Sequence, residues 1–192
     1  MDTTTVIAGL LHDTVEDTDA TIEQITENFG EDLAGLVDGL TKISEISYSS
    51  RKEKQAGNFM KMLLSVAQDM RVIIIKFADR LHNMETLRHM TQIKRHRIAV
   101  ETRDIYVPLA HRLGMSSVKS QLEDLVFTVL NPTGYQKMES MIKSSEKQRQ
   151  KFISKVISPI ENELKKFKIT PSIYGRAKSY ASIYGKMMNR NK

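Results

Sequence analysis

The sequence predicts an all-α protein. Hydrophobic residues make up 40% of its 192 residues but aromatic residues only 6%, with many Leu, Ile and Met, a composition that suits a helical core. Apolar side chains recur at helical spacing, and helix start and stop signals separate the periodic segments. The length suffices for one sizeable core, or for one domain and the start of a second.

The first predicted helix joins an apolar run, residues 6–11, to a polar cluster of one imidazole and three carboxylates. The cluster consists of His12, Asp13, Glu16 and Asp17. Because each residue of a helix turns by about 100°, all four side chains are expected within one arc. Gly9, one turn earlier, would let another backbone approach. A solvated acidic face has the same composition, whereas the apolar run favours a metal-dependent hydrolytic site on an inner helix.

Helices with clear boundaries are expected next along the chain. A Thr and a Gln three residues apart form a capping box that opens a helix over residues 21–28, and Phe29-Gly30 ends it. Another helix is predicted over residues 32–43. A loop over residues 45–50, rich in serine, and a helix over residues 52–68 follow.

Residues 72–77 are nearly all apolar and lead into Asp79, whose carboxylate is therefore expected to be partly buried. Buried carboxylates need an ionic partner, hydrogen bonds or a metal ion, which makes this residue a candidate metal ligand. If the segment is helical, Asn83 and Thr86 lie on the same face. A β-strand over residues 72–77, followed by a polar loop, fits the β-branched run equally well.

The second half of the chain predicts three longer helices, over residues 98–113, 116–130 and 135–168. An Asn-Pro pair ends the second of them. Pro159 interrupts the third, or opens a new helix at its first position. Thr170-Pro171-Ser172 breaks the last helix and marks the candidate domain boundary.

The net charge of +6 hides a strong asymmetry along the chain. Residues 1–50 hold 11 acidic groups and one lysine, whereas residues 51–192 hold 28 basic and 12 acidic groups. A polyanionic nucleotide explains the basic excess, and nucleic acid would explain it as well. The absence of Trp, the few aromatic residues and the lack of a nucleic-acid-binding motif argue against nucleic acid, so no direct DNA binding is expected.

Some classes of protein are excluded by composition. The absence of cysteine rules out disulfides and thiolate metal sites. No apolar run approaches the roughly 20 residues that span a bilayer, and no signal peptide precedes the first motif. A cytoplasmic location and no membrane partner are therefore expected.

Several ordered motifs together resemble one family. They are Gly9-Leu10-Leu11-His12-Asp13 with Glu16-Asp17, then Ile75-Lys76-Phe77-Ala78-Asp79-Arg80-Leu81-His82-Asn83-Met84, Tyr106-Val107-Pro108-Leu109-Ala110-His111-Arg112-Leu113-Gly114, Leu122-Glu123-Asp124-Leu125 and Gly175-Arg176-Ala177-Lys178-Ser179. The first motifs resemble the HD-type hydrolase domain of the bifunctional Rel/Spo enzymes, which make and degrade the alarmone (p)ppGpp. The last is similar to the nucleotide-binding opening of the synthetase domain of that family.

The resemblance implies a domain organisation. An all-α HD-type hydrolase domain would occupy residues 1–130, a helical connector residues 131–170, and the beginning of an α/β nucleotidyltransferase-like synthetase domain residues 171–192. In this family a further metal-binding His comes from an earlier helix, and the acidic residues that hold magnesium lie later in the synthetase domain. We therefore expect a fragment of a longer protein, with both active sites incomplete.

The resemblance also assigns roles to the residues of the hydrolase motifs. The implied ligands of a divalent metal, manganese (Mn²⁺) in this family, are His12, Asp13 and Asp79. The implied catalytic carboxylates, which position and activate the attacking water, are Glu16 and Asp17. The implied nucleotide-binding residues are Asn83 and Thr86, with Asn58 and Lys61 also on the nucleotide side. Imidazole and carboxylate are suitable ligands for Mn²⁺.

The synthetase motif would bind the ATP phosphates of the pyrophosphate donor, with Mg²⁺ held elsewhere in that domain. The implied contacts are Arg176, Lys178, Ser182 and Lys186, whose basic members suit phosphate. A basic, solvated C-terminal tail is the alternative interpretation. Ala177 stands where many relatives carry Pro, and Ser179 where many carry His.

The function implied is metal-dependent hydrolysis of the 3′-diphosphate of (p)ppGpp to GDP or GTP and pyrophosphate, as part of a bifunctional enzyme. A GTP pyrophosphokinase, or a nucleotide-binding regulatory module without catalysis, are the alternatives. The expected small-molecule partners are ppGpp, pppGpp and ATP. The ribosome is expected as a partner only through regions outside this sequence.

Overall fold

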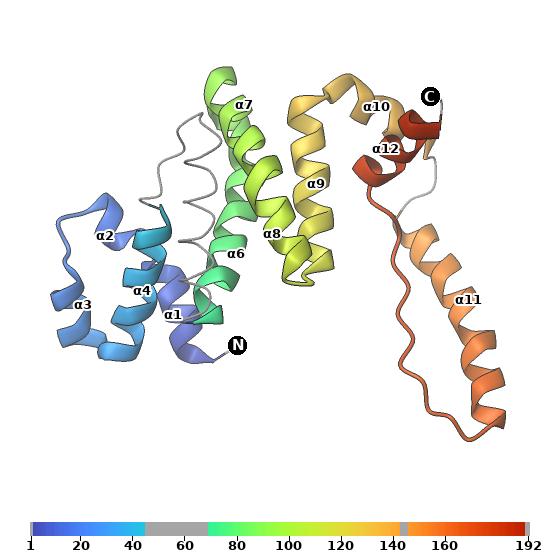
Figure 1. Cartoon of the computed structure of the whole chain (residues 1–192), viewed down its shortest axis with the longest axis horizontal. Helices are drawn as coiled ribbons and strands as arrows, with labels where there is room; N and C mark the ends of the chain where they lie inside the picture. The colour runs from blue at the N-terminus through green and yellow to red at the C-terminus, as the bar shows by residue number, and fades with distance from the viewer. Residues whose placement is uncertain (1, 45–68, 143–145, 191–192) are drawn as a thin grey trace. The chain divides into compact units, whose positions relative to one another are not determined.

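The structure is a computed structural model that describes residues 2–44, 69–142 and 146–190. Within these ranges it contains helices and no strand, which confirms the predicted all-α class (Figure 1). The chain divides into two compact units, Met1–Leu109 and Ala110–Lys192, and each is described by itself. The predicted domain boundaries near residues 130 and 170 stay predictions.

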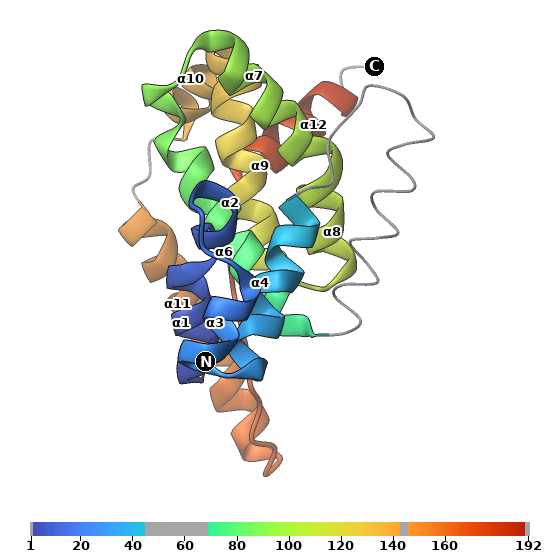
Figure 2. The same ribbon diagram turned by 90° about the vertical axis from the view of Figure 1, so that its left-hand side faces the viewer.

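The first unit is built around three helices that pack against one another, namely α1, α4 and α6 (Figure 2). Its elements are α1 (Thr3–Leu11), α2 (Thr14–Asp17), α3 (Ile22–Phe29), α4 (Glu31–Ser44), α6 (Met70–Thr86), a 3₁₀ turn (Leu87–His89), α7 (Gln92–Glu101) and a π-helical turn (Thr102–Tyr106). Helix α8 (Val107–Arg112) follows and contains the division between the units. The predicted helix over residues 98–113 is thus part of α7, the π-helical turn and α8.

The core of this unit lies between α4 and α6. The largest fully buried side chains that α4 and α6 contribute are Leu36, Leu40, Ile73 and Phe77, and the ring of Tyr106 packs edge to face on Phe77. A Cβ at Gly39 would lie 3.1 Å from Val72 Cγ2, so a glycine lets α4 approach α6 closely. Helix α6 buries apolar side chains on more than one face, which explains why a nearly continuous apolar run fits a helix here as well as it would fit a strand.

Local signals set the helix boundaries of this unit as expected. The Thr21 hydroxyl accepts from the Gln24 backbone N–H and the Gln24 side chain accepts from the Thr21 N–H, so the predicted capping box of α3 is confirmed. Gly30, at φ +86°, ends that helix in a conformation that favours glycine. Helix α6 begins at Asp69, whose carboxylate accepts from the Arg71 N–H. The predictions for residues 45–50 and 52–68 lie outside the described residues.

The second unit contains α9 (Ser116–Leu130), α10 (Pro132–Met141), α11 (Glu146–Lys166) and α12 (Tyr180–Arg190). The predicted boundaries of the helix over residues 116–130 are confirmed. Four rings pack edge to face or tilted between α9, α10 and α12; they belong to Phe127, Tyr135, Tyr180 and Tyr184. Across 57 residues, Asp124 Oδ1 of α9 accepts a hydrogen bond from the Ala181 N–H at the start of α12.

Two details of the predicted helix over residues 135–168 are wrong. It is two helices, because α10 ends at Met141 and α11 begins at Glu146. Pro159 lies inside α11 and does not interrupt it, since this helix is largely solvent-exposed and can tolerate one missing N–H donor. An extended segment follows α11, as Thr170-Pro171-Ser172 predicts. None of the described helices is both long and apolar enough to span a membrane.

Candidate metal centre

The polar cluster after α1 is not a single helical face, contrary to the prediction. Helix α1 ends at Leu11, and His12 and Asp13 form a turn before the short helix α2. The His12 Nδ1 lies 2.8 Å from the Gly9 carbonyl oxygen, one turn back. A carbonyl only accepts hydrogen bonds, so this contact places the ring proton on Nδ1 and leaves the lone pair on Nε2.

Two carboxylates face this Nε2 atom, one from the same turn and one from α6. Asp13 Oδ2 lies 2.9 Å from it, and Asp79 Oδ1 lies 3.7 Å from it. The Asp79 side chain is only 11% exposed, as predicted from the apolar run that precedes it. Packing of α1 against α6 therefore brings together the three predicted metal ligands, although they are far apart in the sequence.

The chemistry of these atoms fits a cation. His12 Nε2 is buried and has no hydrogen-bond partner, and with the proton on Nδ1 it presents a lone pair to oxygens that also only accept. Three electron-pair donors facing one another are stabilised by a positive charge between them, and imidazole with carboxylate suits a transition-metal dication. Within the described residues no group of three such side chains stands in a geometry that could hold one metal ion, so His12, Asp13 and Asp79 are near one another here without forming a complete metal site.

Both oxygens of Asp79 are held by neighbours on α6. Asn83 Nδ2 donates to Asp79 Oδ1 at 2.5 Å, and Lys76 Nζ lies 3.2 Å from Asp79 Oδ2. Asn83, which is predicted to hold the nucleotide, thus contacts Asp79, one of the predicted metal ligands. The Thr86 hydroxyl donates to the His82 carbonyl oxygen of its own helix. The predicted nucleotide roles of Asn83 and Thr86 stay predictions.

The predicted catalytic carboxylates lie on α2. Glu16 and Asp17 are exposed, and their side chains form no hydrogen bond or ion pair with another described side chain. They are therefore accessible to solvent and to a ligand. The structure does not place them in contact with His12 or Asp79, and their role stays a prediction. Asn58 and Lys61 lie outside the described residues.

A pocket of about 340 Å³ lies beside this cluster, between α1 and α6. Its lining consists of Thr5, Val6, Gly9, His12, Ile74, Ile75, Ala78, Asp79 and His82. The nearest group to Gly9 on α6 is a side chain and not a backbone, because a Cβ at Gly9 would lie 4.0 Å from Ile75 Cγ2. Lys76, a buried charge beside the cluster, was not predicted from the sequence, although a lysine inside an apolar run is a recognisable signal of a paired charge.

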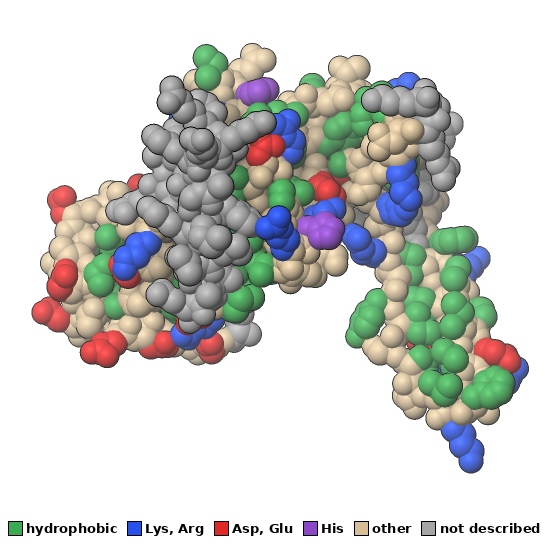
Figure 3. Space-filling view, viewed as in Figure 1, with side chains coloured by type: hydrophobic (Ala, Val, Ile, Leu, Met, Phe, Trp, Pro, Cys, Tyr) green, Lys and Arg blue, Asp and Glu red, His purple; other side chains and the backbone are tan. Residues whose placement is uncertain are grey.

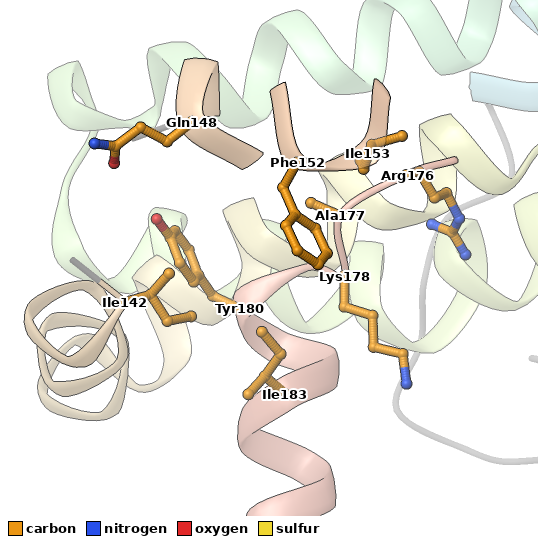
Figure 4. A pocket seen from close by; sticks show the side chains of 9 residues that line it. All are labelled: Ile142, Gln148, Phe152, Ile153, Arg176, Ala177, Lys178, Tyr180 and Ile183. Atoms are coloured by element: carbon orange, nitrogen blue, oxygen red, sulfur yellow. The ribbon is translucent and has the colours of Figure 1, made fainter. Parts of the chain in front are cut away.

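The second unit has a larger pocket, of about 540 Å³, between α11, the extended segment and α12. Figure 4 shows Phe152 and Tyr180 facing it, with Arg176 and Lys178 toward the opposite side. A Cβ at Gly175 would lie 2.3 Å from Ile153 Cγ2, so only a glycine fits where the segment passes α11.

The four predicted ATP contacts are not all gathered around this pocket. The Ser182 hydroxyl accepts from the Ser179 hydroxyl at 2.8 Å, and Lys186 is exposed on α12. Neither lines the pocket, whereas Arg176 and Lys178 do. The structure thus brings together half of the predicted set, and the role of the set stays a prediction.

Comparison with known proteins decides the family of the first unit. A model described as HD domain matches residues 1–116. The chain belongs to the HD domain family. Hydrolases with an HD domain depend on a metal ion, in agreement with the donor set of His12, Asp13 and Asp79.

Curated relatives match the HD domain and the rest of the chain. A guanosine-3′,5′-bis(diphosphate) 3′-pyrophosphohydrolase of Aquifex aeolicus is 48% identical over 187 residues, 97% of this chain and 26% of that protein. A GTP pyrophosphokinase of Myxococcus xanthus is 46% identical over 99% of this chain and 26% of its own length. The bifunctional (p)ppGpp synthase/hydrolase SpoT of Escherichia coli K12 is 44% identical over 98% and 27%. The resemblance to the Rel/Spo family is confirmed, and the chain spans about a quarter of the length of these relatives.

Proposed function

We propose that the first unit carries the hydrolase site of a (p)ppGpp 3′-pyrophosphohydrolase. It would convert ppGpp or pppGpp to GDP or GTP and pyrophosphate. The observation that carries this proposal is the buried Nε2 of His12, which lacks a hydrogen-bond partner and faces carboxylates from two elements. Relatives whose names state this reaction match nearly the whole chain, which supports the same substrate class here.

The metal we propose is Mn²⁺, held by His12 Nε2 and by carboxylate oxygens of Asp13 and Asp79. The mixed nitrogen and oxygen donors suit this ion. When bound, the ion would lower the pKa of a water molecule and offset charge on the 3′-diphosphate. The contact between His12 Nδ1 and the Gly9 carbonyl oxygen orients the ring so that Nε2 faces the carboxylates.

The exposed carboxylates of α2 would act on the attacking water. Glu16 and Asp17 would orient it and accept its proton as its oxygen bonds to the phosphorus next to the ribose 3′-oxygen. The bond between that phosphorus and the 3′-oxygen breaks, and the 3′-oxygen takes up a proton as pyrophosphate forms. Asn83 and Thr86 would help to hold the nucleotide in the pocket between α1 and α6.

A GTP pyrophosphokinase activity of a longer protein is the second candidate. The similarity to the Myxococcus xanthus enzyme and the pocket lined by Arg176 and Lys178 favour it. In this proposal Arg176, Lys178, Ser182 and Lys186 contact ATP phosphates, Mg²⁺ is bound outside this sequence, and the ribosome binds other regions. A regulatory nucleotide-binding module is the remaining alternative.

The experiment that tests the hydrolase is Mn²⁺-dependent release of pyrophosphate from ppGpp, compared between the unaltered chain and Asp79→Asn. We expect the variant to lose more than about 100-fold in rate, because loss of a direct ligand should exceed the cost of losing a group that only supports one. Asp69→Asn, ten residues earlier at the start of the same helix, is the matched control and should keep its activity. Because a further metal-binding His is expected from an earlier helix, the assay is also run on a version extended upstream to include it. Absence of Mn²⁺-dependent release from both forms would favour the regulatory module.

A further inference from the structure

One charged side chain beside the candidate metal centre has no role in the proposed chemistry. Lys76 lies in the apolar part of α6 and is 6% exposed. An ammonium group is rarely buried so completely unless an anion lies beside it. Its position is therefore informative about the carboxylate that it faces.

The two oxygens of Asp79 have different neighbours. Lys76 Nζ lies 3.2 Å from Oδ2. The other oxygen, Oδ1, accepts from Asn83 at 2.5 Å and is the one that lies 3.7 Å from His12 Nε2. The lysine thus occupies the oxygen turned away from the histidine, which leaves Oδ1 on the side of the proposed metal ion.

The lysine also changes the charge of the cluster. Two carboxylates and a neutral imidazole carry a charge of −2, and the buried ammonium reduces it to −1. Since charges interact strongly where water is excluded, a positive charge in contact with a ligand weakens the attraction for a dication. The same charge stabilises the two carboxylates when no metal is bound.

We propose that Lys76 is a positioning residue with a counter-charge function: it directs Asp79 Oδ1 to the metal and limits the affinity of the centre for divalent cations. This inference rests on the proposed metal site. Lys76 keeps the empty centre stable and leaves the ion weakly enough held to exchange. It acts through Asp79 and needs no contact with the nucleotide.

The test is the affinity of Lys76→Met for Mn²⁺ alone, measured by titration calorimetry. Removal of the charge at nearly constant volume is expected to tighten binding by about tenfold or more. Lys76→Arg, which keeps the charge, should bind as the unaltered chain does. Lys119→Met is the control. It removes a lysine of a different ion pair, with Nζ 2.6 Å from Glu123 Oε1 on the same helix, and should leave the affinity for Mn²⁺ unchanged. Unchanged or weaker binding by Lys76→Met would overturn the proposal.

Thermal unfolding provides a second measurement that a purely structural role would not reproduce. Lys76→Met is expected to unfold at a lower temperature than the unaltered chain without metal, and to recover most of that loss with saturating Mn²⁺. Equal losses with and without Mn²⁺ would overturn the proposal. Lys76→Gln, which keeps a hydrogen-bond donor, serves where the methionine variant does not fold. If Mn²⁺ rescues neither variant, the counter-charge function is wrong.

His12→Ala separates failure of this inference from failure of the proposed function. If the unaltered chain binds Mn²⁺ no better than His12→Ala, the metal site itself is wrong, and the inference is wrong with it. If binding depends on His12 but Lys76→Met does not tighten it, only the inference about Lys76 is wrong.

Discussion

The start and the middle of α6 are both rich in charge, but they satisfy it in opposite ways. At the start, Arg71 Nη2 lies 2.6 Å from Asp32 Oδ1 and 2.7 Å from Asp69 Oδ2, and Nη1 lies 3.9 Å from Asp2 Oδ2. The guanidinium thus lies among three carboxylates. In the middle of the helix, Asp79 lies beside the turn that follows α1. Its carboxylate and that of Asp13 face the buried Nε2 of His12, which has no hydrogen-bond partner.

The difference teaches how to distinguish a structural charge cluster from a ligand site on one helix. At the start, donors meet acceptors, so the cluster joins α1, α4 and α6 without a ligand. In the middle, acceptors meet acceptors, which costs stability unless a cation is present. Acidic side chains also gather over the surface of α3 and α4, where water solvates them (Figure 3).

A large effect is expected from His12→Ala, which removes one of the three predicted metal ligands. At Mn²⁺ 100 times above its dissociation constant, binding to the folded state should raise the free energy of unfolding of the unaltered chain by about 2.7 kcal/mol. The variant should lose this increment because Nε2 is gone. Urea unfolding with and without Mn²⁺ measures it. An undiminished increment in the variant would place the ion elsewhere.

An effect of similar size is expected at a buried ion pair between α6 and α7. Arg80 Nη2 of α6 lies 2.6 Å from Glu101 Oε1 and 2.9 Å from the Tyr106 hydroxyl oxygen, and the guanidinium covers the Tyr106 ring. Glu101→Gln leaves a buried cation without its anion and should cost about 3 kcal/mol in the free energy of unfolding. Urea unfolding provides the value.

The control for that variant is Glu163→Gln, in an exposed pair with Lys166. Its cost should stay below about 1 kcal/mol, because water screens the pair. If Glu101→Gln and Glu163→Gln lower the free energy of unfolding equally, burial does not explain the difference expected between the two ion pairs.

A smaller effect, dependent on pH, is expected at the start of α6. Hydrogen bonds from the Arg71 side chain hold the pKa of Asp69 below its usual value. A carboxyl group with a lowered pKa contributes stability above its unfolded-state pKa of 3.8, and the contribution is lost as the pH falls through the folded-state pKa. Stability should therefore decline in acid below about pH 4.

Asp69→Asn isolates this contribution. The variant should be less stable than the unaltered chain by under about 1 kcal/mol at pH 7, since the group is partly exposed. The difference should shrink as the pH falls through the folded-state pKa of Asp69. Urea unfolding between pH 7 and pH 2 measures it, and a constant difference would contradict the assignment to the charge of Asp69.

An effect of similar size to that of Asp69→Asn is expected from the cap of α3. Thr21→Ala removes the hydroxyl that accepts from the Gln24 N–H and should cost about 1 kcal/mol. Part of the cost should be lost in acid, because a hydrogen bond from the Thr21 side chain also holds the pKa of Glu23 below its usual value. Thr21→Ser keeps the acceptor and should be nearly neutral. Equal costs for Thr21→Ala and Thr21→Ser would contradict the assignment of the cost to the hydroxyl acceptor.

Helix ends were well predicted where a few neighbouring residues set them. The capping box at Thr21, the end of α3 at Gly30 and the span of α9 all follow from hydrogen bonds or backbone preferences within one or two turns. The turn at His12 and Asp13 was missed, because nothing in the residues nearby requires α1 to stop there. The path of α11 through Pro159 was missed for the converse reason, since an exposed helix tolerates a proline that a rule based on sequence treats as a break.

What the sequence alone determined about this protein is the helical class and the main helix boundaries, which follow from short spacings, together with the resemblance to the Rel/Spo family, which follows from several ordered motifs. Only the tertiary structure decided that residues 72–77 are helical, that His12 Nε2 faces Asp79, and that Lys76 is buried against the same carboxylate. The physical reason is that these three features depend on packing between α1, α4 and α6. Burial and the distance between remote side chains are set by that packing and not by any local preference.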